Sequence, residues 1–340
     1  MAVAPVPGRV SVVVVSYECA GYLAEPLESL RRQSWPDVEV VVVDNASRDG
    51  SPDVVARDFP EARLLAMDAN LGFAEANNRG VAVSSGEYVF LLNPDAWVEE
   101  DTIARLVGAL AGDPSLGVVG GTVRHPGGAV QEIGNRLDRF GFPVPRREPP
   151  RDPRDTFFVS GCALMTRRRD WDRAEGFDGR YLLFAEEVDL CWRIALAGGD
   201  VAVVPEALIW HHGGVTLSGG YAKDGRHRTN PRRIYLRERN MLATVIKNGS
   251  AATIASAAFG WLMNVGEALG FLALGQPRVA AQYPRALWWN VRELPETLRR
   301  RRKVSAVRRR RDRDLGGWAR GSGKLRVLRA GGIPVVEGRS

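Results

Sequence analysis

Short apolar runs alternate with helical patterns along the N-terminal third of the chain. The apolar runs are rich in β-branched and aliphatic side chains, which is typical of strands buried on both faces. Four such runs are present: residues 10–15, 38–43, 64–67 and 88–92. The last run ends at Asn93-Pro94-Asp95. Proline cannot donate to a sheet ladder, so we expect the strand to stop there.

Helical spacing separates these runs. Leu23, Leu27 and Leu30 recur at that spacing, and Asp101 is placed to cap a later helix. The predicted helices are at residues 22–33, from about 52, after 72 and at 101–110. The resulting β-α-β-α-β-α-β order predicts an α/β fold, with a mostly parallel, Rossmann-like sheet and helices on both sides.

Polar residues repeatedly follow the predicted strands. They are Ser16 and Tyr17, Asp44 and Asn45, Asn70, and finally Asn93 and Asp95. In open α/β sheets, ligands bind at the carboxyl ends of the strands, so these positions favour a nucleotide-type ligand lying across that edge. A carboxylate there suits a hard divalent ion held against a diphosphate. Each position taken singly is also explained by an ordinary turn.

Two common nucleotide-binding motifs are missing. The first strand is followed neither by a Gly-x-x-x-x-Gly-Lys-Ser/Thr loop nor by Gly-x-Gly-x-x-Gly. A phosphate-binding-loop NTPase and a dinucleotide oxidoreductase are therefore both disfavoured.

The middle of the chain is less regular. After a predicted strand at residues 117–123, the segment 124–155 is rich in Gly, Pro and Arg and lacks periodicity, which predicts a long surface loop. A lid that orders on substrate binding and a merely variable loop both fit. Residues 157–165 resume as a strand, and Gly161 beside Cys162 marks a close approach of a ligand.

Three carboxylates and two histidines lie further on. Glu186, Glu187 and Asp189 fall within four residues, where they suit either chemistry or the charged first turn of a helix. After predicted strands at residues 201–204 and 207–210, His211 and His212 precede two glycines, which let backbone come close to a ligand.

Composition and charge describe a globular chain with a basic C-terminal element. Hydrophobic residues make up 45% and charged residues 26% of the 340 residues. The net charge is +7, yet residues 299–313 alone hold ten basic side chains against Asp312. The three cysteines have no paired spacing, and residues 1–8 show no secretory signal, so we expect a reduced, cytosolic setting.

The C-terminal third leaves alternatives open. Residues 251–275 are mostly apolar but carry Asn264, Glu267 and several glycines, so a bilayer span, an interfacial helix and a packed soluble helix all remain. Trp288 and Trp289 beside the polybasic run suit an anionic membrane surface, while a solvated tail is the alternative. No nucleic-acid-binding fold accompanies the run, which disfavours a nucleic-acid partner.

Several of these motifs, in order between Arg9 and Asn240, resemble family 2 glycosyltransferases of GT-A fold. The resemblance is to the rhamnosyltransferase-like branch, which builds bacterial cell-wall and surface polysaccharides. The motifs are residues 12–17, 41–47 with Asp49-Gly50, 70–73 with Asn77, Asn78 and Gly80, and 91–95.

The resemblance implies a donor site and a metal site. Ser16, Tyr17 and Asp44 would contact the nucleobase and ribose of a nucleotide sugar. Further substrate contacts are expected from Asn45, Asn70, Gly72, Asn77, Asn93, Gly161 and Cys162. Asn93 and Asp95 fill the family's Asp-x-Asp motif, which leaves Asp95 as the acidic ligand for Mg²⁺ or Mn²⁺. His211 matches a His-x-Gly-Gly-like element and is the second expected ligand, with His212 the alternative.

It also implies an acceptor site. Glu187 sits at the family's catalytic-base position, where a carboxylate can take a proton from the attacking hydroxyl. Glu186 and Asp189 would orient the base and the acceptor. Arg239, in a basic segment from Arg232 onward, would neutralise the diphosphate, although a solvated basic helix is the alternative.

These expectations combine into one hypothesis. Residues 1–245 would form a GT-A domain, with a nucleotide-sugar half at 9–123, an acceptor half at 156–245 and a helical, basic, membrane-associating extension at 246–340. The protein would be an inverting, metal-dependent enzyme at the cytoplasmic face of the cell membrane, transferring rhamnose from dTDP-L-rhamnose to a polyprenyl-diphosphate-linked saccharide. The alternatives are another donor, such as a UDP-hexose or UDP-galactofuranose, and a non-catalytic nucleotide-sugar-binding or membrane-interaction module.

Overall fold

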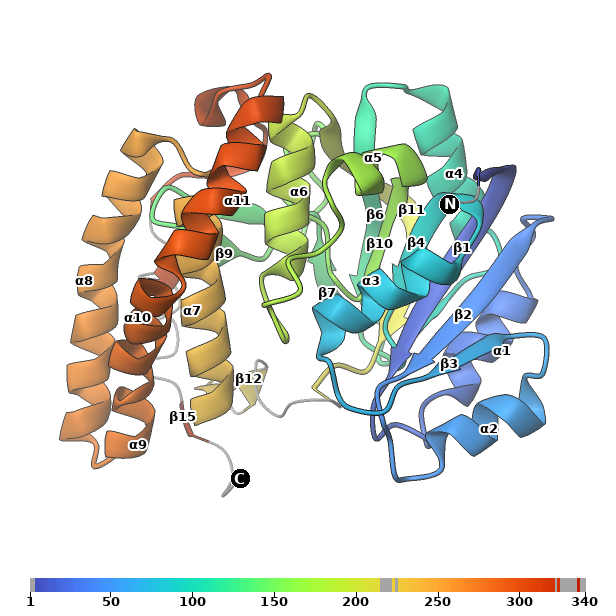
Figure 1. The fold of residues 1–340 in the computed structure, drawn as a ribbon, viewed down its shortest axis with the longest axis horizontal. Coiled ribbons are helices and arrows are strands. Elements are labelled where there is room, and N and C mark those ends of the chain that lie inside the picture. The colour runs from blue at the N-terminus through green and yellow to red at the C-terminus, as the bar shows by residue number, and fades with distance from the viewer. Residues whose placement is uncertain (1–3, 215–221, 224–225, 322, 325–334, 337–340) are drawn as a thin grey trace.

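A central mixed sheet organises the molecule (Figure 1). The computed structural model describes residues 4–214, 222–223, 226–321, 323–324 and 335–336. Within them the sheet contains β1 Val6–Ser16, β2 Val38–Asp44, β3 Arg63–Ala66, β4 Gly86–Leu92, β5 Ala96–Val98, β6 Leu116–Arg124, β7 Val130–Ile133, β10 Ala163–Arg167 and β11 Asp200–His211. Its order is β3-β2-β1-β4-β10-β6-β11-β5, with β7 beside β6. The pairs β1–β2, β1–β4, β2–β3 and β6–β11 are parallel, which confirms the parallel order predicted for the N-terminal strands. β10 pairs antiparallel with β4 and β6, as do β7 with β6 and β5 with β11.

Helices cover both faces of this sheet, as the alternating pattern predicts. They are α1 Ala24–Arg31, α2 Ser51–Asp58, α3 Phe73–Val83, α4 Thr102–Gly112, α5 Arg168–Arg173 and α6 Glu186–Leu196. Successive valines of β1 serve the two faces in turn, because side chains alternate along a strand. Val12 and Val14 belong to the core beneath α1 and α4, whereas Val13 and Val15 belong to the core beneath α3 and α6. The carboxylate of Asp101 pairs with Arg105 at 2.6 Å and does not cap α4.

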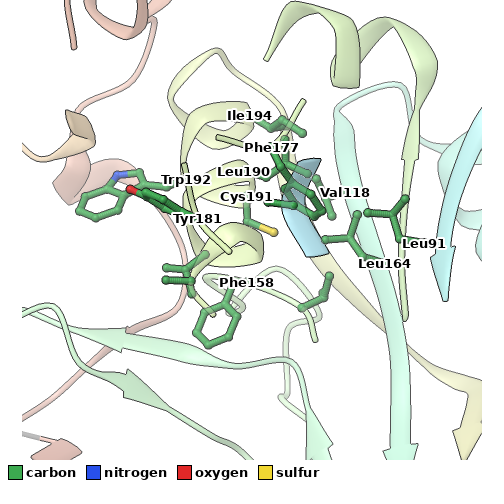
Figure 2. Close-up of a cluster of buried hydrophobic side chains, with 14 of the residues drawn as sticks. Leu91, Val118, Phe158, Leu164, Phe177, Tyr181, Leu190, Cys191, Trp192 and Ile194 are labelled. Carbon is green, nitrogen blue, oxygen red and sulfur yellow. The ribbon is translucent and has the colours of Figure 1, made fainter. Parts of the chain in front are cut away.

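The second of these cores supports α6, the helix that begins with the paired glutamates. Figure 2 shows Leu190, Cys191, Trp192 and Ile194 of α6 gathered with side chains from the sheet. Trp192 is fully buried. The helix is thus anchored along its length, and only its first turn is left to face a ligand.

Two sequence-based expectations about the middle of the chain are wrong. Segment 124–155 is not an unstructured loop: it contains β7, β8 (Arg136–Asp138) and β9 (Pro143–Val144). β8 pairs with β9 and with the distant β14 (Trp318–Ala319), and Leu137 is fully buried. Strands of two to four residues are too short to show periodicity, and one partner of β8, β14, lies far along the chain.

The expected strand at residues 157–165 begins only at Ala163. The preceding residues turn inward, where the backbone N–H groups of Phe157 and Phe158 both donate to the carbonyl of Asn135 at 2.8 and 3.3 Å. The two strands predicted at 201–204 and 207–210 form one strand, β11, with a register shift between Val203 and Leu208.

The C-terminal region is helical, as predicted, and lies on the side of the sheet away from β2 and β3 (Figure 1). Its elements are β12 Ala222–Lys223, β13 Arg226–Thr229, α7 Pro231–Asn248, α8 Ala251–Ala273, α9 Pro277–Ala280, α10 Gln282–Arg292, α11 Leu294–Val307, the 3₁₀ helix η1 Asp312–Asp314 and β15 Val335–Val336. The proposed boundary at residue 245 falls inside α7, and parts of the proposed 246–340 extension lie outside the described residues. None of the described helices combines the length and apolarity needed to cross a membrane.

Candidate active site

A cleft lies at the carboxyl ends of β1, β2 and β4. Both predicted halves of the chain contribute to its walls. The predicted site residues that line it are Tyr17, Asn45, Asn70, Gly72, Asn93, Gly161, Cys162, Glu186, Glu187 and His211. The polar groups that follow separate strands are therefore brought together, as the strand-end argument requires.

Asn45 and Asn70 organise the donor side of the cleft. Nδ2 of Asn45 donates to Oδ1 of Asn70 at 3.0 Å, and Oδ1 of Asn45 accepts from the backbone of Leu71 at 2.8 Å. Oδ1 of Asn70 also accepts from the backbone of Gly72 at 2.9 Å. The two amides thus hold the loop before α3 against the end of β2.

Asp44 lies just beneath this wall. Its side chain is buried, and Oδ2 accepts from the backbone of Ser47 at 2.9 Å. Oδ1 is buried and has no hydrogen-bond partner among the described residues, and Asp44 itself does not line the cleft. Ser16 is also buried, in contact with Cys19, whereas Tyr17 is exposed at the cleft.

Gly72 and Asn77 have structural reasons for their identity. Gly72 has a φ of 81°, and a Cβ there would come within 2.8 Å of Leu182 Cα, so only glycine lets the donor and acceptor walls touch. Asn77 does not line the cleft. It is buried in α3, where Nδ2 donates to the carbonyl of Phe73 at 2.9 Å. In place of the expected substrate contact, it steadies the first turn of that helix.

Asp95, His211 and Gln131 form a chain of polar contacts. Nε2 of His211 lies 3.3 Å from Oδ1 of Asp95, and Nδ1 lies 3.1 Å from Oε1 of Gln131. Burial, the largest single influence, opposes ionisation of Asp95, but the hydrogen bond and charge of His211 and nearby backbone N–H groups together outweigh it and lower the carboxyl pKa. His212 points elsewhere: its Nε2 contacts Glu25 at 2.8 Å. The geometry therefore favours His211 over His212 as a ligand.

The donor set around Asp95 fits a divalent cation. It combines an ionised carboxylate with an imidazole whose orientation is fixed by Gln131. The amide oxygen of Asn93 is buried without a partner among the described residues, and Asn93 lines the same cleft. Among the described residues no group of three His, Cys, Asp or Glu side chains could hold a metal, so bound diphosphate and water would complete the coordination.

The backbone before α6 directs its two glutamates into the cleft. Phe184 and Ala185 both have left-handed φ values, 74° and 68°. Two such residues in succession are costly and persist only when neighbours hold them. Here Nδ2 of Asn240 donates to the carbonyls of Leu183 and Phe184 at 3.0 and 2.8 Å.

Glu186 and Glu187 differ in environment. Glu186 is buried, and Oε2 has no partner among the described residues. Burial, together with the charge of Glu187, raises the pKa of Glu186 well above its usual value. Burial, with a smaller contribution from Glu132, raises the pKa of Glu187 to about 7. Burial thus favours the neutral form of Glu186, whereas Glu187, with a pKa near neutrality, can accept a proton.

Asp189 faces away from the cleft, into a buried ion-pair network. Its Oδ2 accepts from Arg193 at 2.7 Å, and its Oδ1 lies 2.9 Å from Nζ of Lys247. Lys247 also contacts Asp178 at 2.7 Å. The three carboxylates of the motif therefore separate: two enter the cleft, and Asp189, in place of a substrate contact, fastens α6 to α7.

The basic segment on α7 divides in a similar way. Arg239 is buried and does not reach the cleft, because its guanidinium lies over Trp289 at 4.6 Å and donates to the carbonyl of Arg180 at 3.0 Å. Arg232 and Arg233 line the cleft instead. Burial and the charge of Arg237 lower the pKa of Arg233 to about 10, which still leaves it cationic at neutral pH.

Gln131, Glu132 and Lys247 were missed by sequence reasoning. Gln131 and Glu132 sit on β7, inside the segment predicted to be a loop. Their signal is weak: a short alternation of polar and apolar residues at 130–133. Lys247 lies in the last turn of α7 and looks like an ordinary solvated helix residue in the sequence. Only the tertiary fold shows it to be buried.

Sequence comparisons identify relatives of this chain. The model of the family described as Glycosyl transferase family 2 matches residues 11–173. The N-acetylglucosaminyl-diphospho-decaprenol L-rhamnosyltransferase of Mycobacterium tuberculosis is 30% identical over 232 residues, covering 59% of this chain and 75% of the relative. The succinoglycan biosynthesis protein ExoO of Rhizobium meliloti is 36% identical over a shorter stretch, 29% of this chain and 28% of the relative.

Solved structures share the fold at low identity. TarS 1-349 from S. aureus matches with a TM-score of 0.55 at 17% identity, covering 88% of each chain. The mannosyltransferase PcManGT from Pyrobaculum calidifontis, in complex with GDP-Man and Mn²⁺, matches with a TM-score of 0.51 at 21% identity, covering 90% of this chain and 88% of that one. The fold expected from the sequence, GT-A with a helical C-terminal region, is confirmed. The chain belongs to glycosyl transferase family 2, on its rhamnosyltransferase-like branch, and is a nucleotide-sugar-dependent glycosyltransferase.

Proposed function

We propose that the protein is an inverting enzyme that transfers L-rhamnose from dTDP-L-rhamnose to a saccharide linked to a polyprenyl diphosphate. The observation that carries the proposal is the position of Glu187, which faces the same cleft as His211 and the strand-end residues of the donor wall. The mycobacterial relative, whose name states both rhamnosyl transfer and a diphospho-decaprenol acceptor, supports the choice of substrates.

In the proposed mechanism, the donor wall holds the nucleotide and Glu187 activates the acceptor. Oδ1 of Asp44, which has no partner among the described residues, would accept a hydrogen bond from the nucleobase, and Tyr17 lines the cleft beside it. The ionised carboxylate of Glu187 takes the proton of the acceptor hydroxyl as that oxygen attacks the anomeric carbon. Attack from the side opposite the leaving group breaks the bond to the diphosphate and inverts the centre in a single displacement.

Asp95 and His211 would hold a divalent cation beside the leaving diphosphate. Bound there, Mg²⁺ or Mn²⁺ supplies Lewis-acid stabilisation of the leaving group. Arg232 and Arg233 of α7, which both line the cleft, add positive charge to it. The low pKa of Asp95 keeps its carboxylate ionised and available for the cation across the working pH range.

We extend the proposal to attachment at the cytoplasmic face of an anionic membrane. One stripe of α8 exposes large apolar side chains at helical spacing, Phe259, Leu262, Val265, Leu269 and Leu272. The opposite stripe is buried and includes Asn264 and Glu267. An amphipathic helix of this kind, near the polybasic α11, is typical of a helix that lies at a membrane surface and not of a fully solvated one. Sedimentation with vesicles containing phosphatidylglycerol tests this; unaltered binding after Leu262→Glu would oppose it.

The test of the function is a donor panel. The purified enzyme is incubated with Mg²⁺ or Mn²⁺, GlcNAc-diphospho-polyprenol and, in turn, dTDP-L-rhamnose, UDP-glucose and UDP-galactofuranose, and nucleoside diphosphate release is measured. Turnover with dTDP-L-rhamnose alone is expected. Turnover with a UDP-sugar alone would show that this sugar nucleotide, and not dTDP-L-rhamnose, is the donor. Binding without any turnover would favour a non-catalytic module.

A further inference from the structure

A second, open groove lies between α7 and α10. Its walls are Tyr235 of α7 and Pro284, Arg285, Trp288, Trp289 and Arg292 of α10. The groove is apolar and aromatic, with two guanidinium groups at its rim. The indole of Trp288 is 68% exposed, an unusual state for so large an apolar side chain.

The cations of the groove are weakly engaged by the protein. Arg285 lies over the ring of Tyr235 at 5.7 Å, and its hydrogen bond to Gln282 is long, at 3.4 Å. Arg292 contacts Glu293 at 3.4 Å, and Glu293 also lies 3.7 Å from Arg180. Both guanidinium groups therefore keep donors that an anionic ligand can use.

The groove and the cleft share α7 as a wall. Leu236 lines the cleft while its neighbour Tyr235 lines the groove. Arg239 supports the floor of the groove, with its guanidinium over Tyr235 at 5.2 Å as well as over Trp289. The next residue, Asn240, holds the backbone of the cleft wall.

We propose that this groove binds the prenyl-diphosphate portion of the acceptor, with Arg285 and Arg292 at the diphosphate and Trp288 and Pro284 against the isoprenoid chain. This rests on the function proposed above. An isoprenoid diphosphate combines two charged phosphates with a slender branched chain, which matches guanidinium groups at the rim of an aromatic groove. A concave groove suits a single chain, whereas the convex apolar stripe of α8 suits a lipid surface.

The first test measures binding without turnover. Farnesyl diphosphate is titrated into the full-length protein by calorimetry. We expect Trp288→Ala and Arg285→Ala each to weaken binding about tenfold, the equivalent of one lost aromatic or charged contact. The matched controls are Leu287→Ala, an exposed apolar residue on the same helix but outside the groove, and Arg278→Ala on α9; both should bind as wild type does. Equal affinity in all five proteins, or none in wild type, would overturn the groove assignment.

The second test measures KM for two acceptors in detergent micelles, GlcNAc-diphospho-polyprenol and GlcNAc-diphospho-butanol. Trp288→Ala should raise KM only for the long-chain acceptor, and Arg285→Ala should raise it for both, with KM for the donor unchanged. An effect of Trp288→Ala seen in vesicles but not in micelles would assign the groove to the membrane surface and overturn the proposal. Farnesyl diphosphate binding that depends on Trp288, in an enzyme that transfers to neither acceptor, would refute the proposed function and leave the groove assignment standing.

Discussion

The two walls of the cleft are built on different principles. The donor wall consists of side chains that follow strands directly, such as Asn45 after β2 and Asn93 after β4, and neutral amides hold its loops together. The acceptor wall is a helix start whose position depends on buried charges far from its own sequence, above all Lys247. Function on the donor side thus follows from local sequence order. On the acceptor side it follows from tertiary electrostatics.

This difference explains why one wall suits a constant ligand and the other a variable one. Nucleotide sugars all present a base, a pentose and a diphosphate in the same order, and a sheet edge fixes their positions rigidly. An acceptor hydroxyl must instead lie within hydrogen-bond distance of the catalytic base. The helix that carries Glu187 therefore needs contacts that position it independently of the sheet. The network of Asp178, Asp189 and Lys247 gives that support.

The largest expected effect separates the two glutamates of the acceptor wall. Glu187→Gln removes the proton acceptor and should lower kcat about 1000-fold, since general bases contribute roughly 10²- to 10⁴-fold. KM for the donor should change little. Transfer rates and donor KM are measured with dTDP-L-rhamnose.

Glu186→Gln is the matched control for that experiment. The pKa of Glu186 is raised by burial and by the charge of Glu187, which favours its neutral form, and the amide closely imitates that protonated form. We expect less than about a tenfold loss of kcat. If Glu186→Gln proved the more damaging change, the roles of the two residues would have to be exchanged.

A second prediction compares the stability that each wall contributes. Lys247→Met removes a buried cation from between two buried carboxylates and should lower the free energy of unfolding by about 3 kcal/mol. Asn45→Ala, on the donor wall, breaks neutral hydrogen bonds and should cost about 1–2 kcal/mol. Urea denaturation at pH 7 measures both.

The pH dependence of the Lys247→Met deficit checks its electrostatic origin. Asp178 and Asp189 have depressed pKa values in the folded protein, despite burial, because of Lys247 and nearby arginines. The stability that such carboxylates contribute is present above their unfolded pKa, about 3.9, and is lost as pH falls below it. The deficit should therefore be nearly constant from pH 7 to about pH 5 and shrink as the pH falls below about 4. A deficit that is constant with pH would indicate lost packing instead.

The donor wall could be predicted from the sequence because polar residues that follow buried parallel strands all lie at the same edge of the sheet. Asp44, Asn45 and Asn93 were found in this way. The roles of Asp189 and Arg239 could not be separated from those of their neighbours, because burial and ion pairing depend on helices that arrive later in the chain. Gln131 and Glu132 were hidden for another reason: the four residues of β7 pair with β6 inside a segment that has no pattern of its own.

A third prediction concerns Gln131, the contribution of that segment to the proposed metal site. Gln131→Ala frees Nδ1 of His211 and should weaken Mn²⁺ binding about tenfold, the lower end of the effect of removing a partner that orients a metal-ligating histidine. Calorimetric titration of Mn²⁺ in the presence of dTDP measures this. Arg124→Ala on the neighbouring strand β6 is the control. Unaltered Mn²⁺ affinity in Gln131→Ala would remove His211 from the ligand set.

The smallest expected effect tests whether the two walls share an electrostatic field. Glu187 must be deprotonated to act as a base, so kcat/KM should rise with pH and level off above its pKa of about 7. Burial is the main cause of that raised pKa, and Glu132 adds to it from across the cleft. Glu132→Gln removes the added charge and should move the midpoint to lower pH by less than about one unit, which makes the variant several-fold faster than wild type at pH 6. Glu61→Gln, at the exposed surface and paired with Arg31, should leave the midpoint unchanged. A midpoint that stays in place, or rises, in Glu132→Gln would mean that burial alone sets the basicity of Glu187, and that the segment carrying β7 acts on the donor side only.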